Sequence, residues 1–250
     1  MKHVDMIVKS VRPIALDTYE MCLQNDYIAN MAQPGQFLHL LVDGHTLRRP
    51  LSIANTDLVA GMVTILFKTT GDGTRRLAAY MPGARLDVLG PAGNGFHRRS
   101  ETIKTALLIG GGIGVPPLYF LGKDLQKKGV HVTAVLGFQS NAHIFYEQMF
   151  RQLGKTYIVT NDGSYGGHGL VTDALDQVGA IDHYFACGPV PMLRAVTQEL
   201  GSQAGSISLE ERMGCGIGAC FACVIPSHND SGYRKICRDG PVFPAGEVVL

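Results

Sequence analysis

The sequence lacks a large excess of charge of either sign. Its 250 residues include 22 Lys and Arg against 21 Asp and Glu, which gives a net charge of +1 at pH 7. A charge this small does not create the strong positive field that draws proteins to nucleic acid or anionic lipid. We therefore expect neither nucleic acid nor a membrane among the partners of this chain.

The sequence also lacks internal repeats, low-complexity tracts and an N-terminal apolar run of signal-peptide length. With 46% apolar and 17% charged residues it has the composition of an ordered globular protein. One uncharged stretch, 105–122, approaches the length of a membrane span, but Gly110–Gly112 and Pro116-Pro117 would break a lipid-facing helix. We interpret it as a strand, a glycine turn and a helix, and we expect a cytoplasmic protein.

Cysteine is scarce outside one short segment. The chain has six cysteines, and four of them crowd into the C-terminal tail. These four are Cys215, Cys220, Cys223 and Cys237. Because no secretory signal precedes them, we expect reduced thiols or metal ligands rather than disulfides. Of the two others, Cys22 is expected to be a buried apolar residue.

The spacing of the tail cysteines is C-x4-C-x2-C, followed by thirteen residues and the fourth cysteine. This is the plant-type arrangement that binds a [2Fe-2S] cluster. Two bridged irons need thiolates from opposite sides, so a tight loop supplies three and a distant cysteine supplies the fourth. Gly214, Gly216 and Gly218 alternate through the loop, where positive φ turns backbone N–H groups toward the sulfurs.

Two other interpretations of the cysteines stay open. A structural zinc site usually pairs two C-x2-C knuckles, whereas this sequence has one, from Cys220 to Cys223. Disulfides are the remaining alternative and need an oxidising compartment. The spacing favours the iron–sulfur cluster over both.

The first part of the chain, 1–98, is predicted to be an antiparallel β-barrel. Short apolar or β-branched segments such as Phe37–Val42 and Val63–Lys68 are bounded by Gly, Pro and Asp. Turn signals recur between them, for example at Gln33-Pro34-Gly35 and Gly71-Asp72-Gly73. Their spacing is typical of a small barrel.

The pattern changes near 97–100, after which strands alternate with helical stretches. We predict four strands and two helices: Ala106–Ile109, Val130–Leu136, Tyr157–Thr160 and Tyr184–Ala186 as strands, Pro116–Lys128 and Pro191–Leu200 as helices. This alternation predicts a doubly wound parallel sheet over 99–205. The remaining 206–250 is too short for its own core and is expected to be organised by a metal. The fold class is thus α+β with three parts.

Two short motifs in the barrel are candidates for holding a flavin. In Arg49-Pro50-Leu51-Ser52, Arg49 offers a cation for phosphates and Ser52 a hydrogen-bond partner for the ring nitrogens. In Gly71-Asp72-Gly73-Thr74, backbone N–H groups and a hydroxyl suit a pyrophosphate. Alternatively, neither motif binds a ligand: the first is a proline at the start of an edge strand, and the second is a hairpin turn.

A strand, a glycine turn and a helix start follow in Ala106–Pro117. The pattern is G-x-G-x-x-P, from Gly112 to Pro117, and Pro suits the first helical turn. Exposed N–H groups and the helix dipole attract a pyrophosphate there, although a tight corner without a ligand has the same sequence. Cys187 and Asp162 each follow a predicted strand, at the sheet edge where ligands gather in such folds.

These motifs, in this order, resemble the ferredoxin–NADP reductase superfamily. The added cluster loop narrows the resemblance to the electron-transfer subunits of class 1B dihydroorotate dehydrogenase, over essentially the whole chain. The carrying segments are Arg49–Ser52, Gly110–Pro117, Asp162–Ser164, Cys187–Pro189 and the four tail cysteines. One departure from the superfamily is Leu51, which stands where an aromatic residue usually precedes the serine.

The resemblance implies three cofactors and their contacts. FAD is expected to contact Arg49, Pro50, Leu51, Ser52, Leu66, Phe67, Lys68, Gly73 and Thr74. NAD is expected at Gly111, Gly112, Gly114 and Asp162, with Cys187 as the catalytic position near the nicotinamide. The [2Fe-2S] ligands are expected to be Cys215, Cys220, Cys223 and Cys237. No residue clearly recognises or excludes a 2′-phosphate, so NAD over NADP rests on the resemblance.

The resemblance also implies a partner, an FMN-containing catalytic subunit that oxidises dihydroorotate in pyrimidine biosynthesis. The expected assembly is a heterotetramer of two plus two subunits, in which electrons pass from FMN through [2Fe-2S] and FAD to NAD. An alternative is an NAD(P)H-reductase subunit of another redox complex, of the sulfide, sulfite, hydrogenase or transhydrogenase type. A non-enzymatic zinc-stabilised assembly subunit and a redox sensor are further alternatives.

Overall fold

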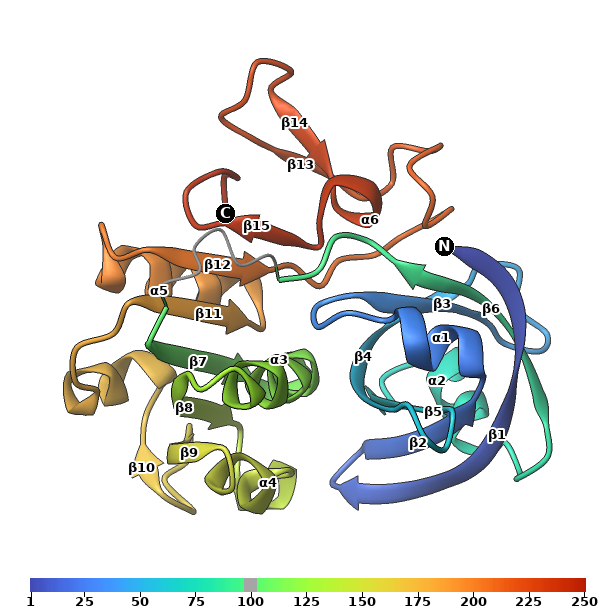
Figure 1. The fold of residues 1–250 in the computed structure, drawn as a ribbon, viewed down its shortest axis with the longest axis horizontal. Coiled ribbons are helices and arrows are strands. Elements are labelled where there is room, and N and C mark those ends of the chain that lie inside the picture. The colour runs from blue at the N-terminus through green and yellow to red at the C-terminus, as the bar shows by residue number, and fades with distance from the viewer. Residues whose placement is uncertain (97–102) are drawn as a thin grey trace.

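The computed structural model describes residues 1–96 and 103–250. In Figure 1 the N-terminal part of the chain forms a barrel, the middle forms a parallel sheet with helices, and the C-terminal part lies against both. The predicted α+β fold class is therefore confirmed. The predicted change of pattern at 97–100, and with it the border between 98 and 99, lies outside the described residues.

The barrel is closed and has six antiparallel strands in the order β1-β2-β5-β4-β3-β6. Two short helices, α1 (Asp26–Met31) and α2 (Asp72–Ala78), connect its strands. The strands are β1 (Lys2–Ala15), β2 (Thr18–Gln24), β3 (Phe37–Leu41), β4 (Arg49–Asp57), β5 (Met62–Lys68) and β6 (Arg85–Ala92). The predicted strands at 37–42 and 63–68 are thereby confirmed as β3 and β5.

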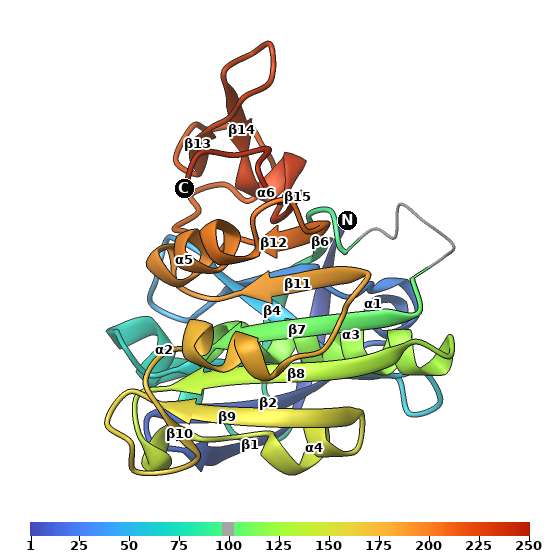
Figure 2. The same ribbon diagram turned by 90° about the vertical axis from the view of Figure 1, so that its left-hand side faces the viewer.

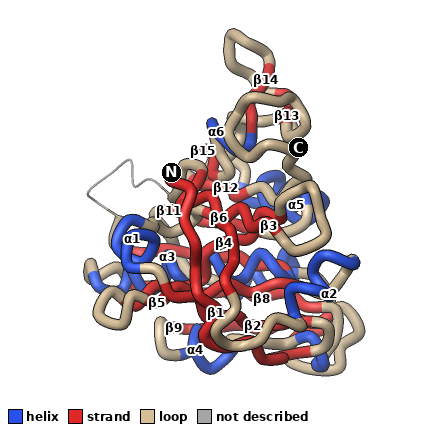
Figure 3. The backbone as a smooth tube through the Cα atoms, turned by 90° about the vertical axis from the view of Figure 1, so that its right-hand side faces the viewer, coloured by secondary structure: helices blue, strands red, loops and turns tan. Residues whose placement is uncertain are grey.

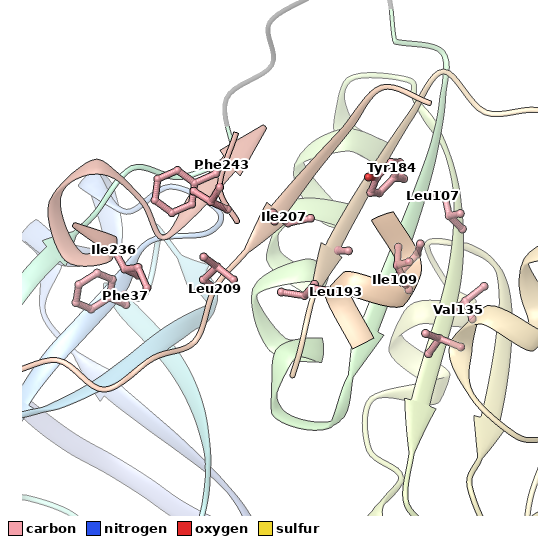
Figure 4. Packing of buried hydrophobic residues seen from close by; sticks show 14 of the residues in the cluster. Phe37, Leu107, Ile109, Val135, Tyr184, Leu193, Ile207, Leu209, Ile236 and Phe243 are labelled. Atoms are coloured by element: carbon pink, nitrogen blue, oxygen red, sulfur yellow. The ribbon is translucent and has the colours of Figure 1, made fainter. Parts of the chain in front are cut away.

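Alternating side chains of the barrel strands pack in two directions, into the barrel core and against the rest of the protein. On β3, Leu38 and Leu40 point into the barrel core, whereas Phe37 packs with Ile236 of the C-terminal segment. Figure 4 shows the Phe37 ring beside Ile236. On β5, Phe67 belongs to the barrel core and Leu66 to the core of the α/β part. The outer face of this part of the barrel is thus buried against the rest of the protein.

The predicted turn at Gly71-Asp72-Gly73 is instead the start of helix α2. The Thr74 hydroxyl accepts a hydrogen bond from the Gly71 N–H (3.2 Å) and donates one to the Gly71 carbonyl (3.1 Å). A side chain that satisfies the free backbone groups of a first turn stabilises a helix start. Glycine spacing alone does not distinguish this capped turn from a hairpin.

The α/β part is a seven-stranded sheet in the order β10-β9-β8-β7-β11-β12-β15. Its strands are parallel except β15, which is antiparallel to β12. The strands are β7 (Thr105–Gly111), β8 (His131–Phe138), β9 (Gly154–Thr160), β10 (Gly167–His168), β11 (His183–Cys187), β12 (Gly205–Ser208) and β15 (Val242–Pro244). The four strands predicted for this region are β7, β8, β9 and β11.

Helices cover both faces of the sheet. Helices α3 (Val115–Lys127) and α4 (Glu147–Arg151) lie between the sheet and the barrel, and α5 (Val190–Leu200) lies on the opposite face (Figures 1 and 2). Successive residues of β7 alternate accordingly, with Leu108 in the core under α3 and Leu107 in the core under α5. The 3-10 turns are η1 (Gly112–Gly114), η2 (Asn141–His143) and η3 (Val171–Gln177).

The uncharged stretch 105–122 contains β7, the turn η1 and the first half of α3. The interpretation as strand, glycine turn and helix is therefore confirmed. Within the described ranges, no helix has both the length and the hydrophobicity that crossing a membrane requires.

The C-terminal segment leaves the sheet after β12 and returns to it as β15. Between them lie a hairpin of β13 (Val224–Pro226) and β14 (Tyr233–Lys235) and the short helix α6 (Ile236–Asp239). The hairpin projects from the molecule at the top of Figure 3. The predicted border at 206 falls inside β12, so this segment shares a strand with the sheet; the three-part division of the chain stays a prediction.

Three polar contacts hold the barrel against the α/β part. The Leu16 N–H donates to the Ala142 carbonyl at 2.8 Å, and the Lys123 ammonium donates to the Asn55 side chain at 2.7 Å. The hydroxyl of the half-buried Tyr146 donates to the Glu20 carboxylate at 2.7 Å. Tyr146 has φ of 60°, a left-handed conformation that a bulky residue adopts only where its surroundings hold it.

We predict that Tyr146→Phe lowers the free energy of unfolding by about 1.5–3 kcal/mol, the range for hydrogen bonds to charged groups. Glu20 keeps its second partner, Arg12, at 2.8 Å. The matched control is Tyr165→Phe, because the Tyr165 hydroxyl donates to Glu147 (3.0 Å) at the surface; we expect a change within about 0.5 kcal/mol. Urea denaturation measures both, and equal losses would contradict the role given to Tyr146.

Candidate functional site

The four tail cysteines come together as two pairs. The Cys215 N–H donates to the Cys220 sulfur at 3.4 Å, and the Cys220 N–H donates to the Cys215 sulfur at 3.3 Å. The Cys237 N–H donates to the Cys223 sulfur at 3.5 Å. We call these four cysteines the cysteine cage. The cage joins a tight loop after β12 to the start of α6, as the spacing predicts.

Backbone N–H groups of the loop point at these sulfurs. The Ile217 N–H donates to Cys215 (3.5 Å) and the Gly218 N–H to Cys237 (3.2 Å). Gly216 and Gly218 have φ of 69° and 81°, values that glycine adopts without strain. Desolvation opposes ionisation of Cys215, yet the N–H groups of Cys220 and Ile217 lower its thiol pKa to about 6. The loop therefore stabilises thiolate before any metal is considered.

Desolvation and the neighbouring Cys223 raise the pKa of the Cys237 thiol to about 12. Cys223 and Cys237 are both buried, whereas Cys215 and Cys220 are half-buried. A bound cation ionises a buried thiol of this kind, because its positive charge stabilises the thiolate that burial disfavours. One pair thus faces the protein interior and the other lies nearer the surface.

The paired arrangement fits two irons better than one zinc ion. In a [2Fe-2S] cluster each iron takes two protein ligands, whereas a structural zinc needs four ligands around one point. The donor set is therefore chemically and geometrically suited to an iron–sulfur cluster.

The flavin motif lies on β4, next to β3, and all four of its residues are half-buried. The structure brings Arg49 together with Gly73, since a Cβ on Gly73 would lie 2.7 Å from the Arg49 guanidinium nitrogens. Arg49 also contacts His45 at 3.1 Å. A cation beside the backbone of the α2 start suits a phosphate group.

The other residues predicted for FAD divide between the two faces of the barrel wall. Leu51 packs against the barrel core, and Phe67 lies within it, stacked on Tyr19 at 6.1 Å. Leu66 faces the α/β part, and Lys68 lines a pocket there. Leu51, at the position usually held by an aromatic residue, thus contributes to the packing of the barrel core.

A pocket of about 550 Å³ opens at the carboxyl ends of the parallel strands. It is lined by residues of both parts of the protein, including Lys68, Gly111, Gly112, Asn161, Gly188 and Glu210. Gly112 has φ of 52°, and a Cβ on it would lie 3.8 Å from the Lys68 ammonium. The glycine turn and the barrel cation thus meet in one cavity at the edge where ligands bind in such sheets.

Gly114, Asp162 and Cys187 lie around this pocket without lining it. A Cβ on Gly114 would lie 2.3 Å from the Cys187 carbonyl oxygen, so this glycine permits close packing of turn and strand. Asp162 is exposed and accepts a hydrogen bond from the Ser164 hydroxyl at 2.6 Å. Burial, with Glu210 nearby, raises the pKa of the Cys187 thiol, so this buried residue is a neutral thiol. Its catalytic role stays a prediction.

Glu210 lines the pocket and was not among the predicted residues. Protein around the cleft desolvates its carboxyl and raises its pKa to about 7, although the side chain stays exposed to the pocket. It follows β12 by two residues, at the carboxyl end of a parallel strand. The rule that places ligands at this edge would have found it, had a strand been predicted at Gly205–Ser208.

The comparisons with known proteins agree with this geometry. The family model described as the iron-sulfur cluster binding domain of dihydroorotate dehydrogenase B matches residues 210–249. A "Dihydroorotate dehydrogenase B (NAD(+)), electron transfer subunit" from Shouchella clausii is 53% identical, with 98% of this chain and 96% of the relative covered. The subunit of the same description from Bacillus velezensis is 51% identical over the whole of both chains.

Among solved structures, the chain is similar to an NADH-dependent reduced ferredoxin-NADP oxidoreductase studied for flavin-based electron bifurcation. The TM-score is 0.88 at 29% identity, with 98% of this chain and 89% of that chain covered. Fold and site therefore define an electron-transfer protein of the ferredoxin–NADP reductase superfamily with an iron–sulfur module. The chain belongs to the family of electron transfer subunits of dihydroorotate dehydrogenase B (NAD(+)).

The raised pKa of Glu210 predicts how stability depends on pH. The folded protein holds this proton up to about pH 7, whereas an unfolded chain releases it near 4.5, so folding takes up a proton in between. The free energy of unfolding should therefore fall as the pH rises through this window.

Glu210→Gln should remove this loss, so the variant gains stability over the wild type between pH 6 and pH 8. Urea denaturation at both values measures the gain. Glu211→Gln is the control, because Glu211 is exposed and does not line the pocket. An equal pH dependence in wild type and Glu210→Gln would show that the carboxyl titrates normally.

Proposed function

We propose that this chain is the electron-transfer subunit of an NAD-linked dihydroorotate dehydrogenase. It would carry electrons from the FMN of a catalytic partner, through a [2Fe-2S] cluster and FAD, to NAD+ in pyrimidine biosynthesis. The observation that carries the proposal is that the paired thiols pack against the barrel wall bearing the flavin motif, while the glycine-rich pocket opens beside the same wall. The cysteine cage, the flavin motif and the glycine-rich pocket thus follow one another across the molecule.

The cluster is proposed to be [2Fe-2S], held by Cys215, Cys220, Cys223 and Cys237. The C-x4-C-x2-C spacing and the two thiol pairs support this type over a zinc site. N–H groups from the loop stabilise negative charge on the sulfurs and so help to set the reduction potential.

FAD, when bound, supplies the exchange between single electrons and hydride that joins a cluster to a nicotinamide. In this chain Arg49 would hold the phosphates beside Gly73 and Thr74, and Ser52 would face the ring. Gly111 and Gly112 would hold the nucleotide end of NAD in the 550 Å³ pocket, with Gly114 and Cys187 packed beside it. Glu210 and Lys68, the latter assigned to FAD, line the same pocket. Asp162 would lie outside that pocket, at the adenosine side.

The catalytic partner is proposed to dock at the cluster loop. Ile217 and Phe221 are 51% and 64% exposed there, which is unusual for side chains this apolar and suits a surface covered in a complex. An assembly of two plus two subunits and a cytoplasmic location complete the proposal. The reduced thiols that the cage requires fit that compartment.

A second candidate, a reductase subunit of another redox complex, is favoured by one finding. This is the similarity, at 29% identity, to the NADH-dependent reduced ferredoxin-NADP oxidoreductase. The relatives with the dihydroorotate dehydrogenase description share 53% and 51% with this chain, so we place that function first.

Reconstitution distinguishes the two candidates. We expect the chain, mixed with an FMN-containing dihydroorotate dehydrogenase subunit, to support NAD+ reduction that depends on dihydroorotate and yields orotate. The chain alone should oxidise NADH with an artificial acceptor but should make no orotate. If it oxidises NADH yet the mixture makes no orotate, another redox complex is favoured.

Cys220→Ser should remove most of the iron and acid-labile sulfide and the red-brown absorption while sparing much of the flavin. The physical reason is that one iron loses a thiolate and the neighbouring N–H loses its sulfur acceptor. The control is Cys22→Ser, since Cys22 lies on β2 outside the cage and is half-buried, not buried as predicted. Full iron and sulfide content in Cys220→Ser would refute the ligand assignment.

A further inference from the structure

His39 lies where the barrel meets the cluster loop. It is fully buried on β3, and its neighbours Leu38 and Leu40 point into the barrel core, so its own ring faces outward. Neither ring nitrogen has a hydrogen-bond partner within the part of the chain that the structure describes. A buried polar side chain without a partner is rare in folded proteins, and it calls for an acceptor or donor at this place.

The backbone of the cluster loop rests directly on the imidazole. A Cβ on Gly216 would lie 2.2 Å from Nδ1 of His39, so only glycine fits there, and its φ of 69° suits glycine as well. Gly216 follows the cluster ligand Cys215 in the chain. The Cys215 backbone lies close enough to favour a proton on the ring but does not meet hydrogen-bond geometry.

The strand that carries His39 pairs with the strand that bears the flavin motif. In the β3–β4 pair, His39 stands opposite Pro50 and Phe37 stands opposite Ser52. Residues directly opposite one another in an antiparallel pair share a face of the sheet. His39 therefore lies on the same face of the sheet as the two motif residues, and the loop residue Gly216 packs on its ring.

The surroundings hold the ring in place. Arg48 donates to the His39 carbonyl at 3.2 Å and pairs with Asp87 at 2.7 Å, and the Phe37 ring meets the imidazole edge-on at 6.4 Å. An imidazole carries an N–H donor in either tautomer, and within the described residues this donor has no acceptor.

We propose that His39 is a positioning residue for the cluster, whose ring N–H donates a hydrogen bond to a cluster sulfur. This inference rests on the proposed [2Fe-2S] function of the cysteine cage. Hydrogen bonds to sulfur stabilise the more negative, reduced cluster and so raise its reduction potential. The same contact ties the cluster loop to the β3–β4 strand pair that bears the flavin motif. One buried side chain thus sets both the reduction potential of the cluster and the distance between the cluster loop and the flavin motif.

The test compares three variants of the holoprotein, purified without oxygen. His39→Leu removes the donor at similar size, His39→Gln keeps an N–H donor, and His131→Leu is the control, since His131 is exposed on β8. Iron content, the electron paramagnetic resonance spectrum of the reduced cluster and its midpoint potential are measured. We expect His39→Leu to shift the potential to more negative values and change the spectrum, whereas His39→Gln and His131→Leu stay near the wild type.

An unchanged potential and spectrum in an iron-replete His39→Leu protein would overturn the proposal and leave His39 a packing residue. If His39→Leu does not retain iron, the proposal is tested on wild-type protein that carries ring-¹⁵N histidine, by measuring the ¹⁵N coupling to the reduced cluster. A ¹⁵N coupling to the reduced cluster that disappears in His39→Gln supports the contact, and its absence in the wild type refutes it. A wild type without iron and acid-labile sulfide would instead refute the proposed function, so the two failures are distinguishable.

Discussion

The pairing of β15 with β12 is the interaction on which the arrangement of the site depends. The chain between these strands is too short to bury a core of its own, and it is tied at both ends to the sheet edge. The Pro241 carbonyl accepts from the Leu209 N–H at 3.0 Å, which closes the loop at its base. Because of this closure Cys237 returns beside Cys223, and the cage is formed against the barrel rather than on a free tail.

That position gives the protein its electron-transfer layout. Phe37 and His39 of β3 cover the inner side of the cage, and Ile217 and Phe221 leave its outer side exposed. A cluster held here would have the barrel on one side and, on the other, the open surface at which we propose that the partner docks. The contacts between Tyr146 and Glu20 and between Lys123 and Asn55 hold the pocket at the barrel wall, since they fix the sheet against it.

Local patterns predicted much of this structure. Short apolar or β-branched segments between turn residues indicated the barrel, and the alternation of strands and helices indicated the parallel sheet, because both signals are local in the chain. The cysteine spacing indicated the cage because its geometry is local except for Cys237. Two features that the sequence did not reveal depend on contacts between distant segments: the pocket position of Glu210 and the place of His39 under Gly216. The cap at Thr74 is local, but glycine spacing alone does not distinguish a capped helix start from a hairpin turn. No local pattern distinguishes a histidine facing a cofactor from one in a strand core.

The most direct measurement of the central claim is the cofactor content of anaerobically purified protein. We expect about two irons and about two acid-labile sulfides per chain, together with one FAD, and a reduced-cluster signal in electron paramagnetic resonance. We further expect that NADH reduces both the flavin and the cluster in this chain alone. A protein that contains zinc, or that lacks acid-labile sulfide and flavin, would contradict the account.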